Sequence, residues 1–126
     1  MQIHYLIAGI LAIAVGLIHS VLGEVLVFSR MRHRQLIPTE GYPLLRERHV
    51  RILWATWHAL TLFGWAMAAM LLDHAWPHTE ADSKRFVLNA IAISMAGASA
   101  LVLFATNGRH PGWLGLLAVA ALIWLT

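Results

Sequence analysis

Apolar residues along the chain fall into four long segments separated by three polar connectors. The segments cover about 3–28, 52–72, 86–106 and 113–125. The first three have the roughly 20 residues that a helix needs to cross about 30 Å of hydrocarbon, and the last is short enough to be a marginal span. We expect helices because they satisfy every backbone polar group internally, and because the segments are too long for barrel strands.

The short connectors predict an all-α fold, an up-down-up-down four-helix transmembrane bundle that forms a single domain over residues 1–126. The expected helices cover about 3–29, 48–73, 83–106 and 111–126. The first segment lacks the basic start of a signal peptide, and its apolar run is too long for one. We therefore expect it to be retained as a span.

Two ionisable residues, His19 and Glu24, interrupt the apolar pattern of the first segment. Placing an imidazole and a carboxyl group in hydrocarbon costs free energy that leucine or valine would avoid. The pair therefore needs either partners on other helices or a task.

Composition agrees with a membrane location. Of the 126 residues 60% are hydrophobic and 12% are charged, which is far from the balance of a soluble domain. Cysteine is absent, so disulfides and thiolate metal sites are excluded. The net charge is +3, but the basic residues lie beside the spans and no nucleic-acid motif accompanies them. We expect the lipid bilayer rather than nucleic acid as the partner, and leave open a homo-oligomer or a membrane-complex partner.

Basic residues are distributed unequally between the two sides of the predicted bundle. One side carries seven arginines, namely Arg30, Arg32, Arg34, Arg46, Arg48, Arg51 and Arg109. The other side has Lys84 and Arg85. The positive-inside rule makes the arginine-rich side cytoplasmic and places both termini outside, in the periplasm if the membrane is a bacterial inner membrane.

Two connectors carry candidate chemistry of their own. The first is expected to be a surface loop whose arginines control topology, with phosphate binding as the alternative. The connector between the second and third segments has His74 and His78 among acidic residues, and could bind a divalent metal weakly. Pro77 disfavours the continuous helix that such a pair requires. Thr79 with Asp82 is typical of a cap at the start of the third helix.

Small residues recur along the first segment at a heptad-like spacing that includes His19. The stripe consists of Gly9, Ala12, Gly16, His19 and Gly23. Such a stripe lets a second helix approach closely, which is how membrane helices associate without a hydrophobic driving force. It predicts that His19 points into the bundle.

Four helix ends share the arginine-rich side of an up-down bundle. They hold His19, Glu24, Arg51, His58, Thr106, Asn107, Arg109 and His110. At 1.5 Å per residue, His19, Glu24 and His58 lie roughly 16, 9 and 10 Å along their helices from a flanking arginine, so their depths are comparable. His110 precedes Pro111, which suits the first turn of the fourth helix, and could close the cluster from above.

Each member of this cluster also has a structural interpretation. His58 could hydrogen-bond a hydroxyl or carbonyl group of a neighbouring helix, and it has Thr61 beside it on its own helix. Glu24 could form a structural ion pair with Arg51 or Arg109. His110, like Arg109, would then lie at the lipid headgroups.

Three short motifs, IHSVLGE, the WH of the second segment and RHPGW before the fourth, resemble a pattern of small bacterial four-span membrane proteins of uncharacterised function. The resemblance covers nearly the whole chain and implies a four-helix membrane architecture. It supplies no activity. The positions to which it points are His19, Gly23, Glu24, Trp57, His58, Arg109, His110 and Trp113.

The leading functional hypothesis is a binding site for a metal ion or another small ligand. Imidazoles and a carboxylate suit Zn, Fe, Mn or Cu, and bundle cores build such sites from facing helices. The expected ligands are His19, Glu24, His58 and His110. No HExxH or Glu-x-x-His pair is present, so each ligand would come from a separate turn.

Three alternatives stay open. The first is a b-type haem held by His19 and His58 in an electron-transfer or quinone-linked subunit. The second is a metal-free enzyme whose catalytic candidates, Glu24 and His58, exchange a proton with a lipid or isoprenoid substrate. The third is a structural subunit in which the polar cluster fixes helix register. No Ser-His-Asp elbow, phosphate loop or nucleotide fingerprint supports a hydrolase or an NTPase.

Overall fold

The computed structural model describes residues 1–125 and is dominated by four helices. They are α1 (Ile3–Leu22), α2 (Glu47–His74), α3 (Glu80–Thr106) and α4 (Gly112–Trp124). A π-helical turn, η1 (Gly23–Val27), and a 3₁₀ turn, η2 (Phe28–Met31), continue α1 without a break. The predicted all-α, four-helix fold is confirmed. Thr126, which was expected to end the fourth helix, lies outside the described residues.

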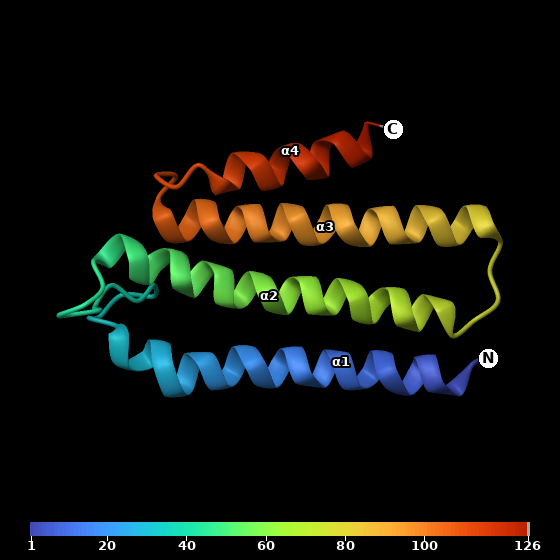
Figure 1. The fold of residues 1–126 in the computed structure, drawn as a ribbon, viewed down its shortest axis with the longest axis horizontal. Helices are drawn as coiled ribbons and strands as arrows, with labels where there is room; N and C mark the ends of the chain where they lie inside the picture. The colour runs from blue at the N-terminus through green and yellow to red at the C-terminus, as the bar shows by residue number, and fades with distance from the viewer. Residues whose placement is uncertain (126) are drawn as a thin grey trace.

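The four helices lie side by side in chain order, and each runs antiparallel to the one before it (Figure 1). Within residues 1–125, extensive packing joins only consecutive helices: α1 with α2, α2 with α3, and α3 with α4. The helices therefore form one layer, with α1 and α4 at its opposite edges, instead of closing around a central core. Any site between helices lies in one of three pairwise seams.

Three of the helical segments are long and apolar enough to cross a membrane: Ile3–Met31, Glu47–His74 and Glu80–Thr106. The fourth, α4, is apolar but has 13 residues. Large apolar side chains are exposed along α1, among them Leu11, Val15 and Leu22. An apolar surface of this extent is stable against lipid and unstable against water, so the chain is a membrane protein.

Local signals fix the ends of α3. The Thr79 hydroxyl accepts a hydrogen bond from the Asp82 backbone N–H at 3.2 Å, which confirms the predicted cap. At the other end Asn107 and Gly108 adopt the left-handed conformation, with φ of 50° and 73°. The chain reverses there with little strain, because Gly and Asn tolerate positive φ.

Glycines allow α1 and α2 to approach closely. A Cβ atom added at Gly9 would lie 2.7 Å from Leu72, and one at Gly16 would lie 2.6 Å from the Trp65 indole. A Cβ at Gly23 would collide with the indole of Trp57. The predicted small-residue stripe of the first helix is confirmed as the packing surface for α2, since each glycine faces one large side chain.

Candidate imidazole site between α1 and α2

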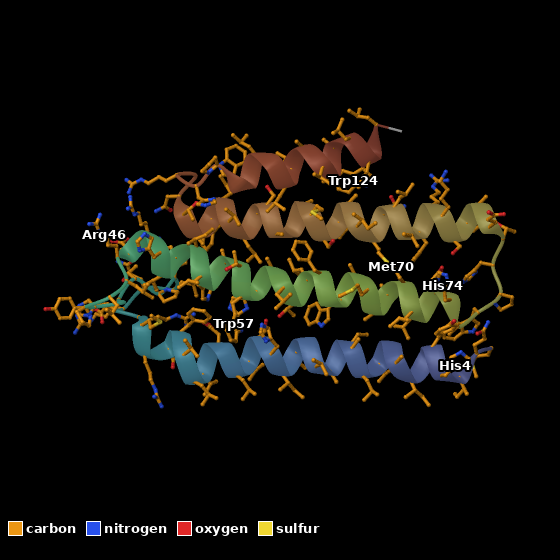
Figure 2. All side chains as sticks on the ribbon, viewed as in Figure 1. His4, Arg46, Trp57, Met70, His74 and Trp124 are labelled. Atoms are coloured by element: carbon orange, nitrogen blue, oxygen red, sulfur yellow. The ribbon has the colours of Figure 1, made fainter. Side chains whose placement is uncertain are left out.

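Helix α2 presents a polar and aromatic face to α1. The face is formed by Trp54, Trp57, His58, Thr61 and Trp65, whose spacing of three and four residues places them on one side of a helix. A buried indole N–H needs an acceptor, and carbonyl groups of α1 provide it. The Trp65 Nε1–H donates to the Ile13 carbonyl and the Trp57 Nε1–H to the His19 carbonyl, each at 3.1 Å. In Figure 2 the labelled Trp57 lies between the two helices.

His19 lies in this seam, as the stripe predicted. Its ring stacks on Trp57, with the ring centroids 4.4 Å apart and the planes inclined by 8°. Its Nε2 atom is buried and has no hydrogen-bond partner among residues 1–125. One face of the ring is therefore packed, while one nitrogen is left unsatisfied, which costs about 1–3 kcal/mol for a buried polar atom.

His58 is held by a chain of hydroxyl groups. Its Nδ1 lies 2.9 Å from the Ser20 Oγ, and this Oγ lies 2.8 Å from the Thr61 Oγ1. The Thr61 hydroxyl donates to the Gly16 carbonyl at 3.4 Å. The structural interpretation of His58, a hydrogen bond to a hydroxyl group of the neighbouring helix, is therefore observed.

Counting protons along this chain assigns the tautomer of His58. A hydroxyl has one proton to donate. The one arrangement in which all three contacts are hydrogen bonds has Thr61 donating to the Gly16 carbonyl, Ser20 to Thr61, and His58 Nδ1–H to Ser20. The proton of the neutral ring lies on Nδ1, so Nε2 carries a free lone pair. This Nε2 is buried and has no hydrogen-bond partner in the described part of the chain.

Glu24 is already paired. Both carboxylate oxygens contact the Arg32 guanidinium, and the Trp54 Nε1–H donates to Oε1 at 3.1 Å. The structural alternative for Glu24, an ion pair, is observed, but the partners named for it from sequence, Arg51 and Arg109, were wrong. Arg51 instead bonds the Glu47 carboxylate at 2.7 Å and the Ala105 carbonyl at 3.0 Å. The reason is local, since Arg32 directly follows η2 and its side chain contacts the residue eight positions before it, while Arg51 is bonded on α2 and α3.

The structure brings His19, Glu24 and His58 into one region. Trp54 links two of them, because it bonds Glu24 and its ring packs against His58 with centroids 4.8 Å apart. His58 is also within electrostatic range of His19, Glu24 and Arg32. Their predicted proximity on adjacent helices is therefore observed.

His110 does not join this region. It lies in the α3–α4 turn, where its Nδ1 accepts a hydrogen bond from the Gly112 N–H at 3.1 Å. Within residues 1–125 no three His, Cys, Asp or Glu side chains gather closely enough to hold a metal ion. The set of four protein ligands expected from sequence is not assembled, because the row of helices keeps the α3–α4 turn away from α1.

Ser20, Thr61 and Arg32 contribute contacts that spacing alone did not assign to the site. A groove of about 550 Å³ runs beside His58, between its helix and α3. Its polar lining comes from Ser20, His58 and Thr61, and the remainder is apolar. The sequence feature that points to Ser20 and Thr61 is their position, since each hydroxyl residue lies beside one of the two histidines on facing helices.

No protein-family model, curated protein or solved structure matches the chain. A fold of this kind supports many functions, so function has to be argued from the atoms of the site. Within residues 1–125 four buried side-chain atoms lack a hydrogen-bond partner: His19 Nε2, His58 Nε2, Arg32 Nε and Asp73 Oδ2. The two imidazole nitrogens are the pair that could ligate a metal ion from facing helices.

Proposed function

We propose that this protein binds a small ligand through His58 and His19, and that the ligand is a transition-metal ion. The observation that carries the proposal is the lone pair on His58 Nε2, which is buried, unpaired and fixed by the hydrogen bond from Nδ1–H to Ser20. An imidazole that ligates a metal uses one nitrogen and donates its other N–H to a neighbouring acceptor. His58 has this arrangement.

His19 supplies the second nitrogen of the proposed site. Its Nε2 is equally unpaired, and stacking on Trp57 restricts the rotation of its ring. Two imidazoles suit Zn, Fe, Mn or Cu, and the remaining coordination positions would be taken by water or by a bound small molecule. Glu24, with Arg32 and Trp54 on its oxygens, serves as a structural tie.

The proposed setting is the cytoplasmic membrane of a bacterium. The seven arginines at one end of the helices would face the cytoplasm, and both termini would lie on the outer side. His19 and His58 would then lie in the cytoplasmic half of the bilayer. This orientation rests on the charge distribution of the connectors.

A b-type haem at His19 and His58 has weaker support. The two rings would have to bracket a macrocycle, whereas Ser20 bonds His58 directly across the seam and Trp57 covers His19. A proton-transfer enzyme acting on a lipid or isoprenoid substrate has one observation in its favour, the apolar groove that borders His58. In that alternative the His58 lone pair would accept the proton, and Glu24 would take no part.

The test is metal analysis of detergent-purified protein, together with its absorbance spectrum. Wild-type protein should hold close to one equivalent of a single transition metal, and His58→Ala and His19→Ala should lose it. His74→Ala is the matched control, because His74 lies on the same helix as His58 with its Nδ1 bonded to the Met70 carbonyl. Unchanged occupancy in His58→Ala overturns the proposal, and a Soret band lost in both variants establishes haem instead.

A further inference from the structure

A second cavity, of about 810 Å³, lies at the end of the molecule that carries the α3–α4 turn. It shares no lining residue with the groove beside His58. The charged side chains of its wall are those of Arg46, Glu47, Arg48, Arg51 and Arg109. With its two histidines neutral, this lining has a net charge of +3. A concave surface of one sign concentrates the electrostatic field and attracts ligands of the opposite sign.

Three of these arginines, Arg46, Arg48 and Arg109, have no carboxylate partner within residues 1–125, and the Arg48 Nε–H donates to the His49 ring at 3.3 Å. Arg51 is used, since it bonds Glu47 and the Ala105 carbonyl. Arg46 and Arg109 form no ion pair within residues 1–125. They come from different elements, Arg46 from the start of α2 and Arg109 from the α3–α4 turn, and the labelled Arg46 marks this end of the molecule in Figure 2.

The start of α2 adds to the positive potential. Arg46 is the residue that precedes the first turn, and no side chain caps the helix there. The first N–H groups of a helix lack partners and carry a partial positive charge, so an uncapped start favours an anion. Glu47 and Arg48, the first two residues of α2, both line the cavity.

We propose that this cavity binds the phosphate group of an anionic ligand, with Arg46 from α2 and Arg109 from the α3–α4 turn as its ligands. A guanidinium fork matches phosphate oxygens in pairs, and a tetrahedral phosphate offers oxygens to two forks at once. A planar carboxylate is satisfied by a single fork. The phosphate would belong to an acidic phospholipid headgroup or to a free phosphate, and the exposed Leu53 and Phe104 beside this end offer a surface for acyl chains.

The experiment compares two doubly substituted proteins of equal charge. Arg46→Gln with Arg109→Gln removes both proposed ligands. Arg30→Gln with Arg34→Gln removes the same charge from the connector after α1, outside the cavity lining. Binding of inorganic phosphate is measured by calorimetry in detergent, and retention of phosphatidylglycerol is measured by native mass spectrometry from nanodiscs of phosphatidylcholine with phosphatidylglycerol.

Wild-type protein should bind at least one of the two probes, and the cavity variant should lose affinity by about tenfold or more, as expected for lost charge-assisted bonds. The connector variant should stay within twofold of wild type. Phosphatidylglycerol without inorganic phosphate identifies a headgroup site, and binding of phosphate alone identifies a site for a soluble anion. Equal loss in both variants, no binding of either probe, or acetate binding as tightly as phosphate overturns the proposal. If the double variant loses helicity, Arg109→Gln alone, in the exposed turn, is used in its place.

Discussion

Two groups of polar atoms lie along the α1–α2 seam and differ in how completely they are paired. The Glu24 carboxylate has a guanidinium and an indole N–H on its oxygens, so its presence in an apolar helix is accounted for by structure. The imidazoles of His19 and His58 are each held on one side and keep one buried nitrogen without a partner. Both groups cost free energy to bury. The Nε–H of Arg32 in the first group is also buried and unpaired, but it is a donor, so only the second group offers a nitrogen that can ligate a metal ion.

This difference shows why an ionisable residue in a membrane helix is weak evidence of function by itself. Sequence alone placed Glu24 and His19 together, as ionisable residues in hydrocarbon that need either partners or a task. A count of donors and acceptors separates Glu24 from the two histidines. Glu24 ties the chain after α1 to α2, while His58 is left with a free lone pair.

The largest expected effect comes from adding a side chain where α1 and α2 are in closest contact, which disturbs both groups at once. Gly23→Ala places a Cβ against the Trp57 indole, whose ring also stacks on His19. Overpacking of this kind should destabilise the protein by about 2 kcal/mol. Unfolding in mixed detergent measures it.

The matched control for that substitution is Gly64→Ala, because no atom lies within 4 Å of a Cβ added at Gly64 on α2. Replacing glycine there should raise stability by about 0.5 kcal/mol. If the two alanine variants behaved alike, close approach at Gly23 would not be what holds the seam together.

An intermediate effect is expected from the paired group alone. Glu24→Gln and Arg32→Gln, alone and combined, form a double-mutant cycle on an ion pair whose side chains are 28% and 27% exposed. Partial exposure screens the pair, so its coupling free energy should be about 1 kcal/mol. Metal content should stay at the wild-type level in all three variants. Loss of metal in Glu24→Gln would return Glu24 to the ligand set, and the Glu24 carboxylate would then no longer differ in role from the two imidazoles.

A change in stability no larger than that of the ion pair, but with a clear change in binding, is expected from Ser20→Ala. It removes the acceptor of the His58 Nδ1–H and should cost about 1 kcal/mol. Loss of such a support for a ligating histidine typically lowers metal affinity about 10-fold to 100-fold. Metal affinity is compared with that of Ser29→Ala, whose hydroxyl bonds the Val25 carbonyl four residues earlier and is remote from His58 in the hydrogen-bond network. Equal affinities would mean that Ser20 does not orient His58.

Sequence periodicity was sufficient to predict the features that are set within a single helix. Segment length predicted the helices, and the glycine stripe identified the face of α1 that meets α2. The depth argument placed His58 level with Glu24 on the adjacent helix. Each of these follows from the rise and repeat of an α-helix, which a sequence specifies directly.

Contacts that depend on how the chain turns between helices were not predictable in this way. Arg32 reaches Glu24 because a π-helical and a 3₁₀ turn follow α1, and no apolar repeat encodes those turns. His110 was expected over the imidazoles because a closed bundle brings four helix ends together. In a row of helices, the α3–α4 turn faces the start of α2 instead, where it lines the arginine cavity.

The single row of helices has a consequence for how the protein assembles during synthesis. Each helix packs extensively only on the helix before it and the helix after it, so no early helix has to wait for a distant one to arrive. The α1–α2 seam, with both imidazoles, is complete once the second helix has been inserted. Folding can therefore keep pace with translation, helix by helix, as it does in linear repeat proteins.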